Sequence, residues 1–194
     1  MEGLTNRRVV LAARPRGVPD AGHFRVEEVP AETPGPGEML IRTRYWSVDP
    51  AMRGWVNDVP NYLPPVGIGA TMRAFAVGEV IESRNPDYAP GDLVSGMFGW
   101  QRYAVSDGSD VDRTVTETDL PLSYALGILG LNGVTAYFGL LEVCAAQPGD
   151  TVVVSTAAGA VGSAVGQIAK IRGCRTVGIA GGPAKTRLCT ERFG

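Results

Sequence analysis

Residues 152–170, VVVSTAAGAVGSAVGQIAK, place a turn of small residues between a β-branched run and a helical pattern. The small residues follow the spacing Ala157-x-Gly159-x-x-Gly162, which is the dinucleotide-binding spacing G-x-G-x-x-G with alanine first. In such a turn the first small residue makes the bend, the second lets the backbone approach a pyrophosphate, and the third allows close helix–strand packing. Amide groups at the start of the following helix then face the anion. Small residues at such a corner also serve packing alone, so the spacing leaves both interpretations open.

The end of the next predicted strand indicates which cofactor such a turn would hold. NAD-preferring sites carry an Asp or Glu there, which binds the ribose hydroxyls. Residues 178–187, GIAGGPAKTR, contain no acid but include Lys185 and Arg187. A basic residue suits a 2′-phosphate and favours NADP, whereas the alternative is a solvated lysine in the first turn of the next helix. A lysine at that point opposes the helix dipole at a cost of about 0.3–1 kcal/mol, which favours a bound anion.

Few residues could build a metal or redox centre. The three cysteines, Cys144, Cys174 and Cys189, are scattered and form no CxxC pair, and the single histidine, His23, lies in a loop rich in Gly and Pro. A zinc site made from several Cys and His ligands is hard to assemble from this set. The sequence therefore predicts no metal site, and thiols that stay reduced.

The composition excludes several classes of partner. The chain has 194 residues, 44% of them hydrophobic, with a net charge of -2, which is an ordinary composition for one or two globular domains. A pI of about 5.5 gives no electrostatic case for nucleic acid. The apolar stretch 120–143 is interrupted by Asn132, Glu142 and glycines, so no membrane span is predicted. The N-terminus lacks a signal-peptide core, and we expect a cytoplasmic protein.

The N-terminal two thirds must fold largely as β-structure. Short apolar or alternating runs are separated by Gly/Pro turn signals, a pattern typical of a small barrel or folded sheet. Asp49 followed by Pro50 suits the N-cap and first position of a short helix. The expected strands cover 7–15, 23–30, 39–48, 74–83 and 93–95.

The character of the chain changes near Leu120. An apolar, mostly helical segment is followed by a strand, a helix, a second strand and the start of another helix, which is the doubly wound pattern. The first strand is rich in β-branched residues, as are strands buried on both faces of a parallel sheet. We therefore predict two domains, 1–122 and 123–194. The elements of the second cover 120–143, 150–156, 160–173, 174–182 and 183–194.

Several motifs, in order along nearly the whole chain, carry a family resemblance: YWSVDPAMRG, VGEVIES, GDLVSGMFGWQRYAV, GVTAYFGLLEV and PGDTVVVSTAAGAVGSAVGQIAK. The chain resembles the zinc-independent medium-chain dehydrogenase/reductases, in the branch of the prostaglandin/leukotriene reductases and related double-bond reductases. The resemblance implies an α/β protein with a GroES-like β-rich N-terminal barrel and a Rossmann domain. That domain is incomplete here, because a doubly wound sheet needs roughly six strands and about two are available.

The resemblance also implies an activity. It is NADPH-dependent reduction of the C=C bond of α,β-unsaturated ketones or aldehydes, with the hydride going to the β-carbon. A quinone reductase of the same superfamily and a non-enzymatic GroES-like binding or oligomerisation module stay open as alternatives. The implied partners are a small-molecule enone or quinone and, for the full-length form, a second copy in a homodimer.

The family's functional residues carry over by motif. The pyrophosphate would be held by Gly159, Ala160, Val161 and Gly162, and the 2′-phosphate by Lys185. Thr135 would lie near the nicotinamide, and Met97 and Phe98 would help to wall the substrate pocket, with ordinary barrel packing as the alternative for these two. The family's tyrosine near the reacting carbonyl would lie beyond Gly194, so no catalytic residue is named. We expect the chain to be the N-terminal part of a longer enzyme and to be inactive alone. The alternatives are a complete but inactive chain and a partner that supplies the second half.

Overall fold

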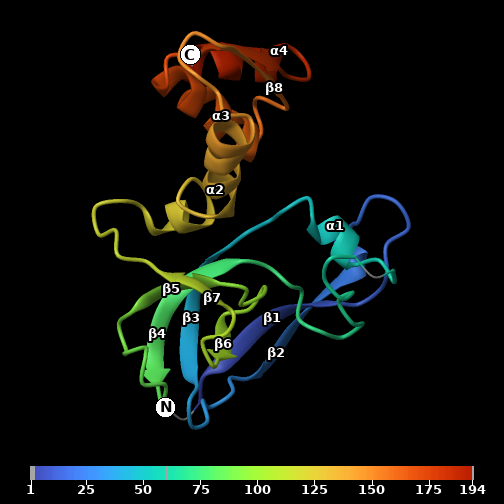
Figure 1. Ribbon diagram of the computed structural model, residues 1–194. Coiled ribbons are helices and arrows are strands. Elements are labelled where there is room, and N and C mark those ends of the chain that lie inside the picture. The colour runs from blue at the N-terminus through green and yellow to red at the C-terminus, as the bar shows by residue number, and fades with distance from the viewer. Residues whose placement is uncertain (1–2, 60, 194) are drawn as a thin grey trace. The chain divides into compact units, whose positions relative to one another are not determined.

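The computed structural model describes residues 3–59 and 61–193, which form two compact units (Figure 1). The first unit ends at Leu126 and the second begins at Gly127. The 3-10 helix η2 (Leu122–Leu126) closes the first unit, where its Ala125 packs with Val77 and Val115. The domain limits 1–122 and 123–194 stay a prediction.

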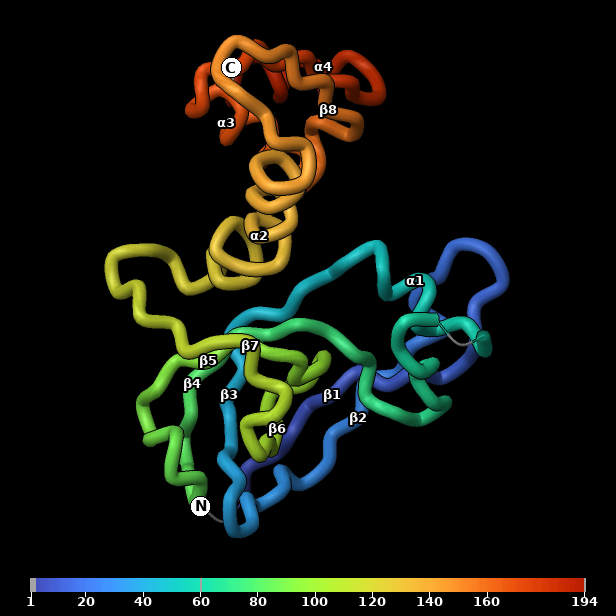
Figure 2. The backbone as a smooth tube through the Cα atoms, viewed as in Figure 1, coloured from blue at the N-terminus to red at the C-terminus, as the bar shows by residue number. Residues whose placement is uncertain are grey.

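The first unit is β-rich, which confirms the expected class of the N-terminal domain. β1 (Thr5–Leu11) and β2 (Phe24–Pro30) form a two-stranded antiparallel ribbon, which Figure 2 shows as two neighbouring blue segments. A five-stranded antiparallel sheet has the order β6-β3-β4-β5-β7. Its strands are β3 (Met39–Trp46), β4 (Ala76–Ser83), β5 (Leu93–Gly96), β6 (Tyr103–Ser106) and β7 (Val111–Thr114).

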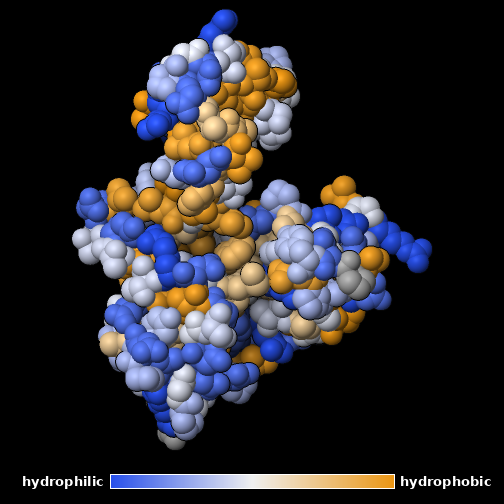
Figure 3. Space-filling view, viewed as in Figure 1, coloured by the Kyte–Doolittle hydropathy of each residue, from blue (hydrophilic) through white to orange (hydrophobic). Residues whose placement is uncertain are grey.

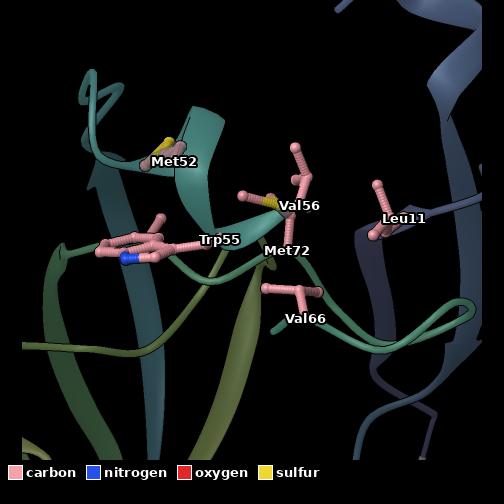
Figure 4. Packing of buried hydrophobic residues seen from close by; sticks show 7 residues of the cluster. Leu11, Met52, Trp55, Val56, Val66 and Met72 are labelled. Atoms are coloured by element: carbon pink, nitrogen blue, oxygen red, sulfur yellow. The ribbon is translucent and has the colours of Figure 1, made fainter. Parts of the chain in front are cut away.

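Besides the cluster at η2, two clusters of buried apolar side chains hold the described part of this unit together. One lies on the sheet, where Met39 and Ile41 of β3 pack with residues of β4 and β5. The other joins the end of β1 to α1 (Met52–Trp55) and the loop after it (Figure 4). Its labelled members are Leu11, Met52, Trp55, Val56, Val66 and Met72.

Two local predictions for this unit are wrong. Asp49 is not the N-cap of α1, because the helix begins at Met52 and its N-cap, Ala51, makes no side-chain cap bond. The Asp49 carboxylate instead accepts a hydrogen bond of 2.5 Å from the Ser47 hydroxyl. β1 also ends earlier than predicted. After Leu11 the chain forms a loop that is held by the Arg14 guanidinium, which donates to three main-chain carbonyls of the segment that follows α1.

The second unit is a β-α-β-α arrangement, as predicted. α2 (Leu131–Phe138) continues into the π-helical turn η3 (Gly139–Val143). β8 and β9 then pair in parallel, in register from Thr151–Arg175 to Ser155–Ile179, and α3 packs on both strands. The remaining bounds are β8 (Thr151–Ser155), α3 (Ala160–Ile171), β9 (Arg175–Ile179), α4 (Pro183–Leu188) and the π-helical turn η4 (Cys189–Phe193), together with η1 (Ala21–His23) of the first unit.

The expectation that β8 is buried on both faces is wrong for the described residues. Val152 packs against α3, but Val153 on the opposite face is 61% exposed, and Ile179 of β9 is 58% exposed. The reason is that α3 covers one face of this pair and no other described element covers the second face. The space-filling view shows hydrophobic residues gathered on the surface of the unit that carries α2 and α3 (Figure 3).

Candidate cofactor-binding site

The turn between β8 and α3 is built around Thr156. This residue has a left-handed backbone with φ of +52°, and its carbonyl accepts the Gly159 amide at 2.8 Å. The next amide, that of Ala157, donates to the carbonyl of Ile179 at 3.0 Å and ties the turn to the end of β9. The bend is therefore made by Thr156, one residue before the alanine to which the sequence pattern assigns it.

Three glycines are required here because the chain approaches itself closely. A Cβ on Gly162 would lie 2.3 Å from the Thr156 carbonyl oxygen, and one on Gly159 would lie 3.0 Å from its Cγ2. A Cβ on Gly178 of β9 would lie 2.9 Å from the Ala157 methyl group. No real Cβ tolerates a contact much below 3 Å, so the absence of side chains brings α3 against the sheet.

The N-terminus of α3 has the form of an anion site. Gly159 is its N-cap, with an extended φ of -83° and ψ of 172°, and no side chain caps the first turn. Over its 12 residues the backbone dipoles give the N-terminus a partial positive charge of roughly half an elementary charge. Gly159, Ala160, Val161 and Gly162 all lie at this end. The Gly159 amide is bonded to the Thr156 carbonyl, so the amides of residues 160–162 are the ones that can face a pyrophosphate.

Lys185 lies at the same edge of the sheet. β8 and β9 run in parallel and in register, so the turns that follow them leave the sheet on one side. After β9, Gly182 adopts φ of +82° and Pro183 is the first residue of α4, which puts Lys185 in the first turn with an exposed side chain. The structure thus brings the glycine turn and this base to one end of the second unit.

A pocket of about 210 Å³ lies beside the turn. Gly162 and Gly166 of α3, Gly178 of β9, and Thr186 and Cys189 at the other side belong to its lining. Because most of these side chains are small, the hollow between the two helices stays open over β9.

Thr135 belongs to α2, which packs against α3. Its hydroxyl donates to the carbonyl of Leu131 at 2.7 Å, and the side chain is exposed. The first turn of α2 is closed by Gly133, where an added Cβ would lie 1.8 Å from the carbonyl oxygen of Ile128. Thr135 is thus positioned by a tight backbone contact that the sequence pattern does not show.

Met97 and Phe98 lie in the first unit, directly after β5. Phe98 is 3% exposed and packs with Met39 and Ile41 in the sheet core, which is the packing that the sequence left as an alternative. Met97 is half-buried. Their role as a wall of the substrate pocket remains a prediction, for which Met97 offers the more accessible side chain.

Residues 3–59 and 61–193 offer neither a metal centre nor a membrane-spanning helix. In that part of the chain, no group of three or more His, Cys, Asp or Glu side chains could hold a metal ion. None of its helices has the length and apolar character needed to cross a membrane. Cys144 is exposed, Cys189 is half-buried and Cys174 is buried, and all three are free thiols.

An ion-pair network in the first unit perturbs a carboxyl group. Glu79 of β4 accepts hydrogen bonds from Arg42 at 2.9 Å and Arg44 at 2.7 Å. These bonds hold the pKa of Glu79 below its usual value, and the two positive charges add to the effect. The network lies on the sheet surface and serves the stability of this unit.

The first unit identifies the family. A family model described as the N-terminal domain of oxidoreductase matches residues 7–114, which is more than half of the chain. The chain belongs to this oxidoreductase family. Its relatives below include a curcumin reductase and a prostaglandin reductase, which confirms the predicted branch of the family.

Both units are shared with known proteins. The chain is 50% identical to the NADPH-dependent curcumin reductase of Escherichia coli (strain K12), over 97% of its own residues and 54% of that protein. It is 45% identical to prostaglandin reductase 1 of Oryctolagus cuniculus, over 87% and 47% respectively. The crystal structure of CurA in complex with NADPH from Vibrio vulnificus matches 97% of this chain and 56% of that one, with a TM-score of 0.88 and 44% identity. The chain therefore spans about half the length of these relatives, and its two-part fold is confirmed.

Proposed function

We propose that this chain is the N-terminal part of an NADPH-dependent reductase of the C=C bond in α,β-unsaturated ketones and aldehydes. The observation that carries the proposal is the uncapped first turn of α3, which close-contact glycines hold against the sheet edge. Support comes from the relatives, since the name of one at 50% identity is NADPH-dependent curcumin reductase. That of another at 36% identity is 2-alkenal reductase (NADP(+)-dependent).

Different residues of this chain would bind different parts of NADPH. Gly159, Ala160, Val161 and Gly162 would hold the pyrophosphate. The amides of residues 160–162 would donate to it, because they are free of a side-chain cap and carry the positive end of the helix dipole, while Gly159 would let the backbone approach. Lys185 would pair with the 2′-phosphate through its exposed ammonium group. The Thr135 hydroxyl, already oriented by its bond to the Leu131 carbonyl, would lie beside the nicotinamide. When bound, NADPH would supply the hydride that the β-carbon of the enone receives.

The proposed enzyme would work without zinc, in a reducing compartment. We infer zinc-independent chemistry, because the single histidine and the scattered cysteines lack the ligand motifs of the zinc branch. Three free thiols support a reducing compartment such as the cytoplasm. Met97 would contact the substrate from the first unit, and a homodimer would be the assembly of the full-length form.

Turnover assays test the activity. The full-length protein that contains this chain is mixed with NADPH and a series of enones, enals and quinones, and the loss of NADPH absorbance is followed. We expect turnover of enones and enals by the full-length protein and none by the 194-residue chain. Turnover of quinones alone would favour the quinone reductase. Failure with every acceptor, together with no binding of NADPH, would favour the non-enzymatic module.

Cofactor choice is tested by Lys185→Ala in the full-length protein. Loss of one charge-assisted hydrogen bond should weaken NADPH binding by roughly 10- to 100-fold and leave NADH binding nearly unchanged. Arg175→Ala is the matched control, because Arg175 is an exposed base at the opposite end of β9. If Lys185→Ala lost equal affinity for NADPH and NADH, or if both variants lost equal affinity for NADPH, Lys185 would not be the residue that binds the 2′-phosphate.

A further inference from the structure

Thr156 has an unusual backbone conformation for its residue type. Its φ of +52° lies in the left-handed region, which β-branched residues rarely adopt because Cβ crowds the following carbonyl. Such a conformation persists only where the surrounding structure determines it, and such sites gather where a ligand is held. The dinucleotide-binding spacing gives this position no role.

The contacts of Thr156 explain why the conformation is kept. On one side its carbonyl oxygen accepts the Gly159 amide at 2.8 Å and occupies the space that a Cβ of Gly162 would need. On the other side, the Ala157 amide is bonded to Ile179 and its methyl group fills the space above Gly178. Residue 156 is thus clamped between the first turn of α3 and the end of β9.

We propose that Thr156 is the positioning residue of the cofactor turn. Its left-handed conformation directs its carbonyl beneath the first turn of α3, and this contact sets where the amides of residues 160–162 stand at the sheet edge. The ligand that these amides receive is the pyrophosphate of NADPH, so the inference rests on the proposed function. It follows that glycine is required at 162 because of the backbone at 156.

The positioning role of Thr156 is tested by measuring the NADPH affinity of single and double variants at residues 156 and 162 of the full-length protein. In Gly162→Ala the new methyl group meets the Thr156 carbonyl at 2.3 Å and displaces the turn, so we expect binding to weaken by roughly 10- to 100-fold. In the double variant with Thr156→Gly, the carbonyl can move without steric cost, and affinity should return to within a few-fold of wild type. Gly166→Ala, one turn later in α3 with no atom within 4 Å of the added carbon, should bind as wild type does.

The outcomes separate the two proposals. Additive effects of the two substitutions, in a wild-type protein that binds NADPH, would overturn the role of Thr156 and leave the proposed function standing. A wild-type protein that binds no NADPH would overturn the proposed function itself. Should Gly162→Ala fail to fold, the NADPH affinity of Thr156→Gly decides. Glycine at 156 no longer holds the carbonyl beneath α3, so affinity should fall by a few-fold, whereas unchanged affinity contradicts the inference.

Discussion

Gly133 offers a strong test of how the second unit is packed. Alanine normally stabilises a helix interior relative to glycine by about 1 kcal/mol. Gly133 is the third residue of α2, in its first turn, and helix propensity alone predicts that Gly133→Ala is stabilising. The structure predicts the opposite, because the added Cβ would lie 1.8 Å from the carbonyl oxygen of Ile128 and 2.6 Å from its carbonyl carbon.

The size of the effect follows from this overlap. To restore a contact of 3.0 Å, the turn before α2 must move by about 1.2 Å, and both partners are backbone atoms rather than flexible side chains. Forcing extra volume into a packed site costs typically about 1–3 kcal/mol. Gly139→Ala is the matched control. Gly139 caps the same helix with helical φ and ψ of -60° and -44°, and an added Cβ there would have no atom within 4 Å.

The assay is thermal unfolding of both variants in the full-length protein. We expect Gly139→Ala to equal or exceed wild type and Gly133→Ala to fall below it, by a difference of roughly 2–4 kcal/mol between the two. The full-length protein should be about twice as long as this chain, since the chain spans 54% of a relative. At that length the shift is about 1–2 °C per kcal/mol, so the two midpoints should differ by roughly 2–8 °C. Equal midpoints, or a gain in Gly133→Ala, would refute the close contact and with it the positioning of Thr135 by this turn.

Further predictions concern both units. Glu79→Gln should lower the unfolding midpoint at neutral pH, because bonds from Arg42 and Arg44 hold the pKa of Glu79 below its usual value in the folded state. A carboxyl group with such a lowered pKa stabilises the fold at pH values above its unfolded-state pKa, and this stabilisation is lost as the pH falls through its folded-state pKa. The difference from wild type should therefore vanish in acid, and a difference that persists there would contradict the assignment. Arg14→Ala, which frees three main-chain carbonyls, should speed hydrogen exchange or proteolysis around α1. Arg14→Lys should not restore protection, because Arg14 donates to these carbonyls from Nη1 and to Asp58 from Nη2, and a lysine has a single nitrogen. Thr135→Val should lower kcat while the NADPH dissociation constant stays within about two-fold of wild type, and a large loss of affinity would place Thr135 elsewhere in the site.

Local signals were sufficient for the order of elements in the second unit. The β-branched run before Ser155, the small residues at 157–162 and the helical spacing after them are all near neighbours in sequence, so their preferences act without help from distant residues. The same holds for the β-rich character of the first unit, where turn residues mark the ends of short strands. The family motifs added the cofactor and the reaction, neither of which periodicity can indicate.

Contacts between distant residues decided the rest. The sequence pattern assigns the bend to Ala157, yet the left-handed residue is Thr156, because the carbonyl there must fit beneath Gly162 and the following amide must reach Ile179. Phe98 lies in the core because β3 and β4 meet it there, which its own neighbours in sequence do not reveal. The sequence by itself determined the type and order of the elements around a dinucleotide-binding turn. Only the tertiary structure decided which atoms hold that turn in place, since close backbone contacts depend on where separate strands and helices come together.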